Sequence, residues 1–384
     1  GNFVQLHNHT HYSLLDGASK VPDLVKRVKE LGMPAVGITD HGNMHGAYEL
    51  WRAAVDSGVK PIIGIEAYVT PETARQDKTR VSWDTNWTPV PGHARNPDDV
   101  SGGGLITHLT MWAENDEGLV NLIKASSVAN LEGRVMRYPR MDKEVLSTYS
   151  KGVIASSGCP SGIIQTRLRL GQFDEALRAA GEFQDIFGKD NFYIELMDHG
   201  LSIESKVTGD LLTIAKKLGA PLLATNDSHY VMEADKDAQD AMLCINSGAT
   251  LDDPNRFKFE GSGYYIKSAE EMRELFKDHP DACDNTLEIA ERCNVIFDDH
   301  EDGAFMPQFD CPEGWDETSL FLKKVEEGLE KRYDGNPPME VLKQADYECG
   351  VICQMQFCGY FLVVADYINW AKEHGVMVGP GRGS

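Results

Sequence analysis

The sequence contains no long uninterrupted apolar stretch, and this absence excludes one large class of proteins. No run approaches the roughly 20 apolar residues that a membrane-spanning helix needs. An apolar run already begins at Phe3, which leaves no room for the charged and apolar regions of a secretory signal. We therefore expect a soluble protein of the cytoplasm that does not contact a membrane.

Cysteines are few and scattered. The 8 cysteines follow no spacing typical of a disulfide framework, so we expect reduced thiols, as in the cytosol. The tightest group is Cys349, Cys353 and Cys358. Its helical spacing and apolar neighbours favour a buried helix face over a zinc knuckle.

Basic residues are also in short supply: 37 Lys and Arg face 60 Asp and Glu, which gives a net charge of -23. Binding to duplex DNA depends mainly on Lys and Arg at phosphates, so this balance argues against a dedicated duplex-binding module. It does not exclude an enzyme that holds one phosphodiester through metal ions, because bound cations offset the charge of clustered carboxylates.

Strand-like and helix-like stretches alternate through the first two thirds of the chain. Seven apolar, β-branched runs cover residues 3–6, 35–39, 61–69, 105–112, 152–155, 191–196 and 221–225. Helical periodicity marks residues 21–31, 44–55, 115–129, 173–187 and 202–218. This alternation predicts an α/β fold with parallel strands and right-handed crossovers, closed into a barrel related to the eight-fold (β/α) type.

The pattern changes after about residue 250, and a length of 384 residues favours a second domain. Helices are expected at residues 268–276, 282–293, 319–333, 337–355 and 361–372, the first capped by Ser268 with Glu271. The acidic stretch 298–302 marks a junction. We predict one domain over residues 1–285 and another over 286–384.

Residues able to bind metals follow nearly every predicted strand. His7 and His9 are two residues apart, so in a strand both imidazoles point to the same face. Taken alone, the pair is read equally well as two surface or hydrogen-bonded histidines. Other such residues follow with the same logic: Asp16, His41, Glu66, His108, Cys159, Asp227 and His229. If the strands form a barrel, these side chains meet at one end of it, the mouth.

Nine donors are too many for one ion but suit a cluster of three divalent ions bridged by Glu66. Imidazole and thiolate favour zinc, while the carboxylates leave manganese or iron possible. Such a cluster polarises a phosphoryl oxygen and lowers the pKa of water, so that hydroxide attacks in line. The predicted reaction is therefore phosphoester hydrolysis. Glu195, Asp198 and His199 also end a strand and are interpreted as supporting or structural groups.

Two further segments are open to more than one interpretation. The long stretch 71–104 carries Trp83 and Trp87 among Arg and Lys residues, which could stack bases. A solvated insertion without a ligand is the preferred interpretation. The final Gly379–Ser384 stretch is either a phosphate-binding loop or a turn.

These motifs resemble a known family. The pattern consists of His7-x-His9, Thr39-Asp40-His41-Gly42, Gly64-x-Glu66 and Asn226-Asp227-x-His229, together with His108 and Cys159. It is similar to the PHP (polymerase and histidinol phosphatase) superfamily. The stretches Leu6–Gly17 and Gly379–Ser384 resemble, more closely, the bacterial C-family replicative DNA polymerases.

The resemblance implies a distorted (β/α)7 barrel, the PHP domain, followed by the first part of a polymerase palm. In that family His7, His9, Glu66 and Asp227 would hold one metal, Glu66, His108 and Cys159 a second, and Asp16, His41 and His229 a third. It implies part of a DNA-directed DNA polymerase, a nucleotidyltransferase, whose PHP domain acts as a 3′-5′ proofreading exonuclease.

The implied partners are the single-stranded 3′ end of DNA, a sliding clamp and other replisome subunits. Gly383 and Ser384 would contact the phosphates of the incoming nucleotide, and the aspartates that bind the polymerase magnesium would lie beyond residue 384.

Two alternatives stay open. One is a free-standing PHP phosphoesterase that acts on a small molecule such as histidinol phosphate. The other is a metal-stabilised scaffold without activity that docks a clamp or a separate exonuclease.

Overall fold

The computed structural model describes residues 2–14, 16–90, 95–298 and 306–381, and it divides into two compact units. The first unit is Gly1–Phe297 and the second is Asp298–Ser384. Residue 285, the expected boundary, lies inside the helix Pro280–Arg292, which packs on the strands of the first unit. The functions assigned to the two domains stay predictions.

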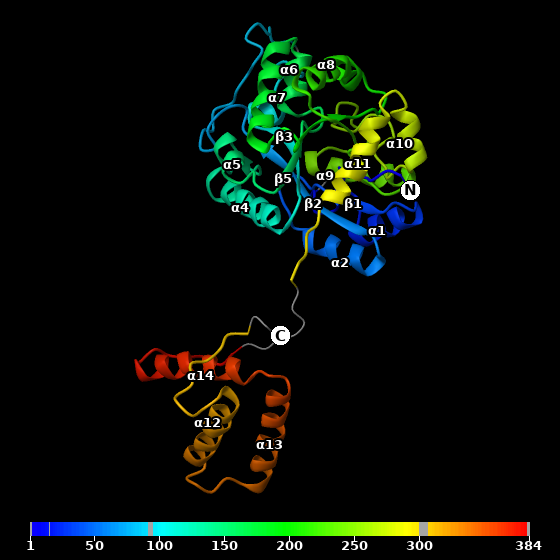
Figure 1. Cartoon of the computed structure of the whole chain (residues 1–384). Helices are drawn as coiled ribbons and strands as arrows, with labels where there is room; N and C mark the ends of the chain where they lie inside the picture. The colour runs from blue at the N-terminus through cyan, green and yellow to red at the C-terminus, as the bar shows by residue number, and fades with distance from the viewer. Residues whose placement is uncertain (1, 15, 91–94, 299–305, 382–384) are drawn as a thin grey trace. The chain divides into compact units, whose positions relative to one another are not determined.

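The first unit is built around one curled sheet with helices arranged around its outside (Figure 1). Its neighbouring strands are β1, β2, β3, β5, β6 and β7, in that order, and β4 pairs with β2. The bounds are β1 Ala35–Ile38, β2 Lys60–Val69, β3 Thr107–Ala113, β4 Arg140–Met141, β5 Val153–Ser156, β6 Phe192–Leu196 and β7 Leu222–Ala224. The predicted α/β barrel of the distorted (β/α)7 type is confirmed.

The N-terminal segment lies between the first and last strands and brings the two edges of the sheet together. The Gly37 amide donates to the Gln5 carbonyl at 2.8 Å on one side. On the other side the His9 amide donates to Ser228 at 2.8 Å and the Ser228 amide to His7 at 3.1 Å. The predicted strand 3–6 thus forms isolated bridges rather than a regular strand, because it pairs only briefly with each neighbour.

The expectation of parallel strands throughout is wrong for β3, which runs antiparallel to both β2 and β5. The chain leaves β2 through the irregular stretch 71–104, whose described residues, 71–90 and 95–104, contain no long crossover helix, only the short α3 Ser101–Gly104. An antiparallel neighbour needs no crossover. As a result, β3 begins where β2 ends, so that His108, near its start, lies opposite Tyr68.

The helices follow the predicted amphipathic stretches, with additions. Their bounds in the first unit are α1 Val21–Glu30, α2 Ala47–Ser57, α4 Asp116–Glu132, α5 Lys143–Thr148, α6 Ile163–Arg169, α7 Phe173–Phe187, α8 Ser202–Leu218, α9 Lys236–Ser247, α10 Ala269–Leu275 and α11 Pro280–Arg292, with a 3-10 turn at Glu233–Asp235. Four elements, α5, α6, α9 and β4, were not predicted from the sequence. The Ser268 cap is confirmed, since its hydroxyl accepts from the Glu271 amide at 3.2 Å.

The barrel interior is apolar at the end away from the mouth. Each neighbouring strand contributes to one buried cluster, which α11 closes; its members are Val4, Leu6, Ala35, Ile62, Trp112, Ile154, Tyr193, Leu223, Ile289, Ala290 and Cys293. A larger cluster fills the space between the strands and the outer helices. Polar side chains inside the barrel are therefore gathered toward the other end.

The described part of the second unit contains three helices: α12 Glu317–Arg332, α13 Met339–Gln354 and α14 Cys358–Glu373. Its small core joins Leu320, Phe321, Cys358 and Leu362, with Cys349 and Cys353 packed against it, as the helix-core interpretation expected. Gly383 and Ser384 lie outside the described residues.

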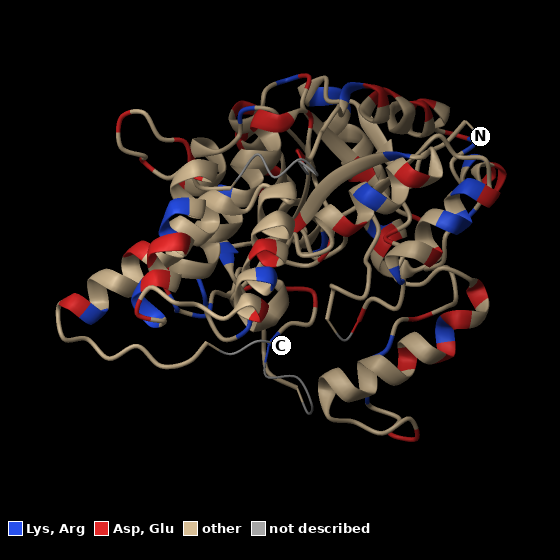
Figure 2. Cartoon of the chain, turned by 90° about the horizontal axis from the view of Figure 1, so that it is seen from below, with Lys and Arg blue, Asp and Glu red and all other residues tan. Residues whose placement is uncertain are grey.

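Among the described residues no single helix is long and apolar enough to cross a bilayer. Only α13 and α14 taken together, bent by 114° at the break between them, reach that length and apolar composition. Acidic and basic residues are interspersed along the helices in the view of Figure 2.

Candidate metal centre

The nine predicted ligands come from seven separate segments, and the structure brings them together at the mouth of the barrel. Each of the nine side chains lies close to at least one other. They are His7, His9, Asp16, His41, Glu66, His108, Cys159, Asp227 and His229. Because β3 is antiparallel, His108 reaches the mouth from the start of its strand rather than from its end.

Glu66 lies at the centre of the cluster and is fully buried. One carboxylate oxygen lies 3.5 Å from His7 Nε2 and 3.2 Å from His108 Nδ1. The other lies 3.4 Å from His9 Nε2 and 2.6 Å from His41 Nδ1. A carboxylate with two histidines on each oxygen has the arrangement of a bridging ligand.

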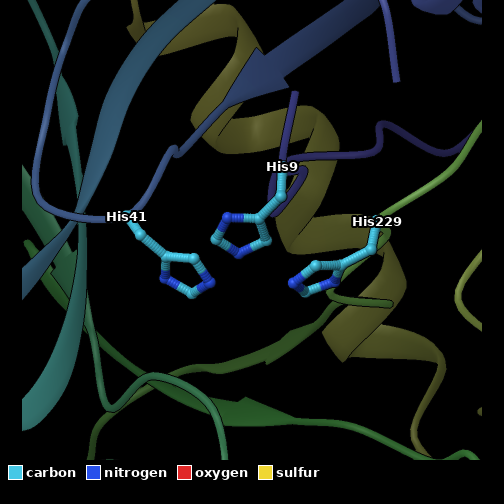
Figure 3. A group of neighbouring side chains, drawn as sticks. All are labelled: His9, His41 and His229. Atoms are coloured by element: carbon cyan, nitrogen blue, oxygen red, sulfur yellow. The ribbon is translucent and has the colours of Figure 1, made fainter. Parts of the chain in front are cut away.

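Three imidazoles from distant parts of the chain lie side by side (Figure 3). His9 is stacked between His41, with ring centroids 4.0 Å apart, and His229, at 4.3 Å. One nitrogen of each ring lies within 4.8 Å of the others. Further groups at this spacing are His7 with His9 and Glu66, and His41 with Glu66 and His108.

Neighbouring side chains fix the orientation of the His7 and His9 rings. The Glu195 carboxylate lies 2.7 Å from His7 Nδ1 and accepts from Thr225 Oγ1 at 2.5 Å. A proton on Nδ1 leaves the His7 Nε2 lone pair for a metal. The sequence interpretation of Glu195 as a supporting group agrees with this geometry.

His9 is oriented in the same way through a hydroxyl. Its Nδ1 lies 2.9 Å from Ser13 Oγ, which donates to Asp40 Oδ1 at 2.7 Å. Asp40 also accepts from the Thr10 amide at 2.7 Å and so fixes the turn that leads to Asp16. The close approach of Gly17 to the Thr10 carbonyl, where a Cβ would come within 2.1 Å, requires glycine in this turn.

Asp227 has a strained backbone, with φ of 45°. A non-glycine residue in the left-handed region is held there by its surroundings, and such strain concentrates at functional sites. Its carboxylate lies 3.3 Å from His7 Nε2 and 3.0 Å from His9 Nε2. His108 and Cys159 form another corner, with Nδ1 and Sγ 3.3 Å apart.

The donor atoms fit metal ions because they are buried and lack hydrogen-bond partners among the described residues. The unsatisfied atoms include His7 Nε2, His9 Nε2, Asp16 Oδ1, His41 Nδ1, both Glu66 carboxylate oxygens, Asp227 Oδ1 and His229 Nε2. Buried polar atoms are normally satisfied, and each exception needs an explanation. Here the atoms face one another without hydrogen-bonding geometry, as ligands around shared ions do.

The electrostatics of three donors, His9, Asp16 and Cys159, bear on metal binding. Burial, together with the imidazoles of His41 and His229, lowers the pKa of His9 to about 3 and keeps it neutral, the form that binds metal. Burial opposes ionisation of Asp16, but His41 and His229 outweigh it and lower its pKa to about 2. Burial and the Glu66 carboxylate raise the pKa of Cys159 well above its usual value, so thiolate ligation would release a proton.

Two cavities open onto the cluster. The larger, of about 540 Å³, is lined by Asp16, His41, His108, Cys159, Asp227 and His229 and by the segment Phe257–Glu260. The smaller, of about 290 Å³, is lined by Asp16, His41 and Tyr68 and by Arg134 and Arg137. Asp16 and His41 are therefore accessible from both cavities.

Sequence reasoning missed both of these cavity walls. It considered aromatic and basic side chains only in the stretch 71–104, where it preferred a solvated insertion without a ligand. There Trp83 stacks on the Arg167 guanidinium at 3.8 Å. In the same stretch Arg75 pairs with Asp142 at 3.1 Å. The alternation Phe257-Lys258-Phe259 was the available signal for an aromatic and basic wall.

Comparison with known proteins gives two family matches. The PHP domain family matches residues 5–199, more than half of the chain, and the family described as the bacterial DNA polymerase III alpha NTPase domain matches residues 319–384.

Curated relatives match along the whole chain. DNA polymerase III subunit alpha of Mycobacterium leprae is 50% identical over 384 residues, which are 100% of this chain and 32% of the relative. The subunit from Treponema pallidum is 41% identical over 100% of this chain and 31% of the relative. The chain thus spans about a third of the length of these relatives.

Solved structures resemble it more weakly. An amidohydrolase from Chromobacterium violaceum is 15% identical, with a TM-score of 0.35, over 59% of this chain and 87% of that one. A two-domain protein from Bacteroides vulgatus with a PHP-like metal-dependent phosphoesterase is 12% identical, with a TM-score of 0.34, over 74% and 62%.

Proposed function

This chain belongs to the PHP domain family, and on that premise we propose that it hydrolyses phosphodiester bonds at the 3′ end of single-stranded DNA. The observation that carries the proposal is the group of buried, unsatisfied donors around Glu66. Nitrogen, thiolate and carboxylate donors in this number suit three divalent ions, with zinc favoured and manganese or iron possible.

The ligand sets are those that the family resemblance implies. His7, His9, Glu66 and Asp227 would hold one ion, Glu66, His108 and Cys159 a second, and Asp16, His41 and His229 a third. When bound, such ions neutralise the charge of a phosphodiester and make water a stronger nucleophile at neutral pH. The chain's own contribution is to keep the donors oriented, through Glu195 at His7 and through Ser13 and Asp40 at His9.

The basic wall of the smaller cavity supports a polyanionic substrate. Arg134 and Arg137 lie on the connection between α4 and β4, which is held by reciprocal backbone hydrogen bonds of 3.0 Å between Val135 and Tyr138. Met136 at its tip has φ of 54°. Burial raises the pKa of Tyr68 to about 12, so its hydroxyl stays protonated beside the arginines and can donate to a phosphate.

The wider proposal is that the chain is part of a replicative DNA polymerase that proofreads with this domain. Residues 286–384 would be the beginning of the palm, with Gly383 and Ser384 at the phosphates of the incoming nucleotide and the polymerase magnesium outside this segment. The sliding clamp and other replisome subunits would be partners, and the cytoplasm the compartment. The relatives' name and the match over 319–384 support this proposal.

The test is an assay on single-stranded DNA labelled at its 5′ end, with the 384-residue chain and zinc or manganese. We expect products shortened stepwise from the 3′ end, with release of mononucleotides. Intact DNA in every metal would overturn the proposal. Intact DNA together with rapid hydrolysis of a phosphomonoester would favour the small-molecule phosphatase instead.

A further inference from the structure

The segment Phe257–Glu260 forms a wall of the larger cavity directly beside the metal centre. We propose that Phe257 is a stacking platform for a nucleobase at the 3′ end of the substrate strand, with Lys258 beside its phosphates. This assignment rests on the proposed function and adds to it a site that recognises a base rather than a phosphate.

A ladder of aromatic rings leads from a predicted ligand to the platform. The Phe259 ring meets His229 edge to face, with centroids 4.7 Å apart, and lies 4.8 Å from Tyr264. Phe257 meets Phe259 at 6.0 Å, also edge to face. His229 and Tyr264 are buried and Phe259 is partly buried, whereas the Phe257 side chain is 61% exposed.

Phe257, the exposed end of this ladder, presents much of its ring to solvent. Leaving an aromatic ring in water forgoes the free energy of burying its apolar area. Every nucleobase has a flat π-face, and stacking on an aromatic side chain covers both surfaces without selecting one base. A single-stranded end is the form of nucleic acid in which such a face is accessible.

The platform is fixed at both of its ends. Before it, the Arg256 guanidinium pairs with both carboxylate oxygens of Asp240 on α9 at 2.5 Å. After it, the Tyr264 carbonyl accepts from the His229 amide at 2.8 Å. The segment is thus held close to His229. A strand that binds there does not have to order this part of the chain, which lowers the entropic cost of binding.

The charge next to the platform suits a nucleic acid backbone. Lys258 is exposed and forms no hydrogen bond or ion pair with any described residue, so its ammonium can approach a phosphate. Glu260 lies on the same wall and repels phosphates there. The favourable path for a strand therefore runs along Phe257 and Lys258.

Binding tests the platform without depending on cleavage. The 384-residue chain would be titrated, in manganese, into a fluorescein-labelled oligothymidylate of about ten nucleotides whose last linkage is a phosphorothioate. A second oligonucleotide would carry an abasic 3′-terminal nucleotide. We expect the wild type to bind the complete strand about tenfold more tightly, the effect of one base–aromatic stack.

Three variants give matched comparisons. Phe257→Ala should lose this tenfold preference, and Phe257→Trp, which keeps a larger ring, should retain it. Leu251→Ala removes a side chain that precedes the segment, is 60% exposed and does not line the cavity, so it should behave as wild type. Melting curves would show that all three are folded, as the exposure of both positions leads us to expect.

The outcomes separate the platform from the nuclease. A wild type without preference for the complete strand, or a Phe257→Ala variant that keeps it, overturns the platform. A preference that depends on Phe257 in a chain that cleaves no phosphodiester supports the platform and overturns the proposed function. In an active chain, Phe257→Ala should raise KM for the oligonucleotide about tenfold with little change in kcat.

Discussion

Two groups of charged side chains lie near the end of β2, and they differ in what neutralises them. Glu66, within the strand, has both carboxylate oxygens buried and without hydrogen-bond partners. Glu72, just beyond the strand, accepts from Arg178 at 2.6 Å and also from Arg167. Lys143 Nζ lies 3.6 Å from Glu72 Oε1. We call Glu72, Lys143, Arg167 and Arg178 the Glu72 network.

The residue type alone does not separate these two groups. Burial opposes the ionisation of both glutamates, and in both cases nearby cations outweigh it. His108 and His41 lower the pKa of Glu66, and Arg178 and Arg167 lower the pKa of Glu72. The difference lies in the geometry of the hydrogen bonds. A network whose hydrogen bonds are all satisfied stabilises the fold, whereas buried donor atoms without hydrogen-bond partners indicate a site where a ligand binds.

The largest expected effect is on catalysis. Asp227→Asn removes a charged donor that lies 3.0 Å from His9 Nε2, and we expect phosphodiester hydrolysis to fall roughly 10²- to 10³-fold, since metal ions contribute several kcal/mol to such reactions. Initial rates on the labelled strand would measure this. Asp198→Asn, at an exposed carboxylate after β6, is the matched control and should keep full activity. An unaffected Asp227→Asn variant would favour the scaffold interpretation.

Metal removal should separate the two groups by their effect on stability. Ions at about 100 times their Kd stabilise the folded chain by about 2.7 kcal/mol, which corresponds to a rise in Tm of roughly 5 °C or more. Calorimetry of chelator-treated protein with and without zinc would show it. Glu66→Gln should abolish the rise and Glu72→Gln should retain it; an equal loss in both would contradict the distinction.

A smaller effect is expected from the group that orients His7. Glu195→Gln should weaken metal affinity about 10- to 100-fold, because an amide no longer fixes the proton on Nδ1. Competition with a chromophoric chelator would measure the affinity. His199 and Glu204 form a similar pair 2.6 Å apart, outside the nine predicted ligands, so Glu204→Gln is the control and should leave affinity unchanged.

The smallest effect concerns the network itself. Glu72→Gln should lower the free energy of unfolding at pH 7 by about 1 to 2 kcal/mol and leave hydrolysis unchanged. Because the folded-state pKa of Glu72 is lowered, its contribution is complete above the unfolded value of about 4.3 and is lost as the pH falls through the folded value. Urea titrations should therefore show the wild type and the variant converging below about pH 4.

The sequence was sufficient for the barrel and for the candidate ligands because both depend on short-range patterns. Continuous apolar, β-branched runs ending in polar tips predict the strands, and the same tips carry His41, Cys159 and Asp227. The direction of β3 could not be read in this way. A strand's hydrophobicity is the same in either direction, and only the missing crossover helix in the stretch 71–104 hinted at the reversal.

The cavity walls were harder to predict for a different reason. Arg137 and Phe257 belong to irregular segments, whose position depends on tertiary contacts such as the Arg256–Asp240 ion pair rather than on periodicity. The same holds for Trp83, one face of whose ring is covered by Arg167 on α6. Composition indicates stacking ability but not which side chains are already occupied.

The N-terminal segment, which lies between the first and last strands of the sheet, has a consequence for how metal binding and folding are coupled. His7 and His9 lie on the short segment whose backbone joins the sheet edges, and their amide and carbonyl groups pair with Ser228. Metal loading and barrel closure should therefore be one coupled equilibrium. Deuterium uptake at the amides of His9 and Ser228 should slow on addition of zinc, while uptake in the Trp112 layer at the opposite end stays constant.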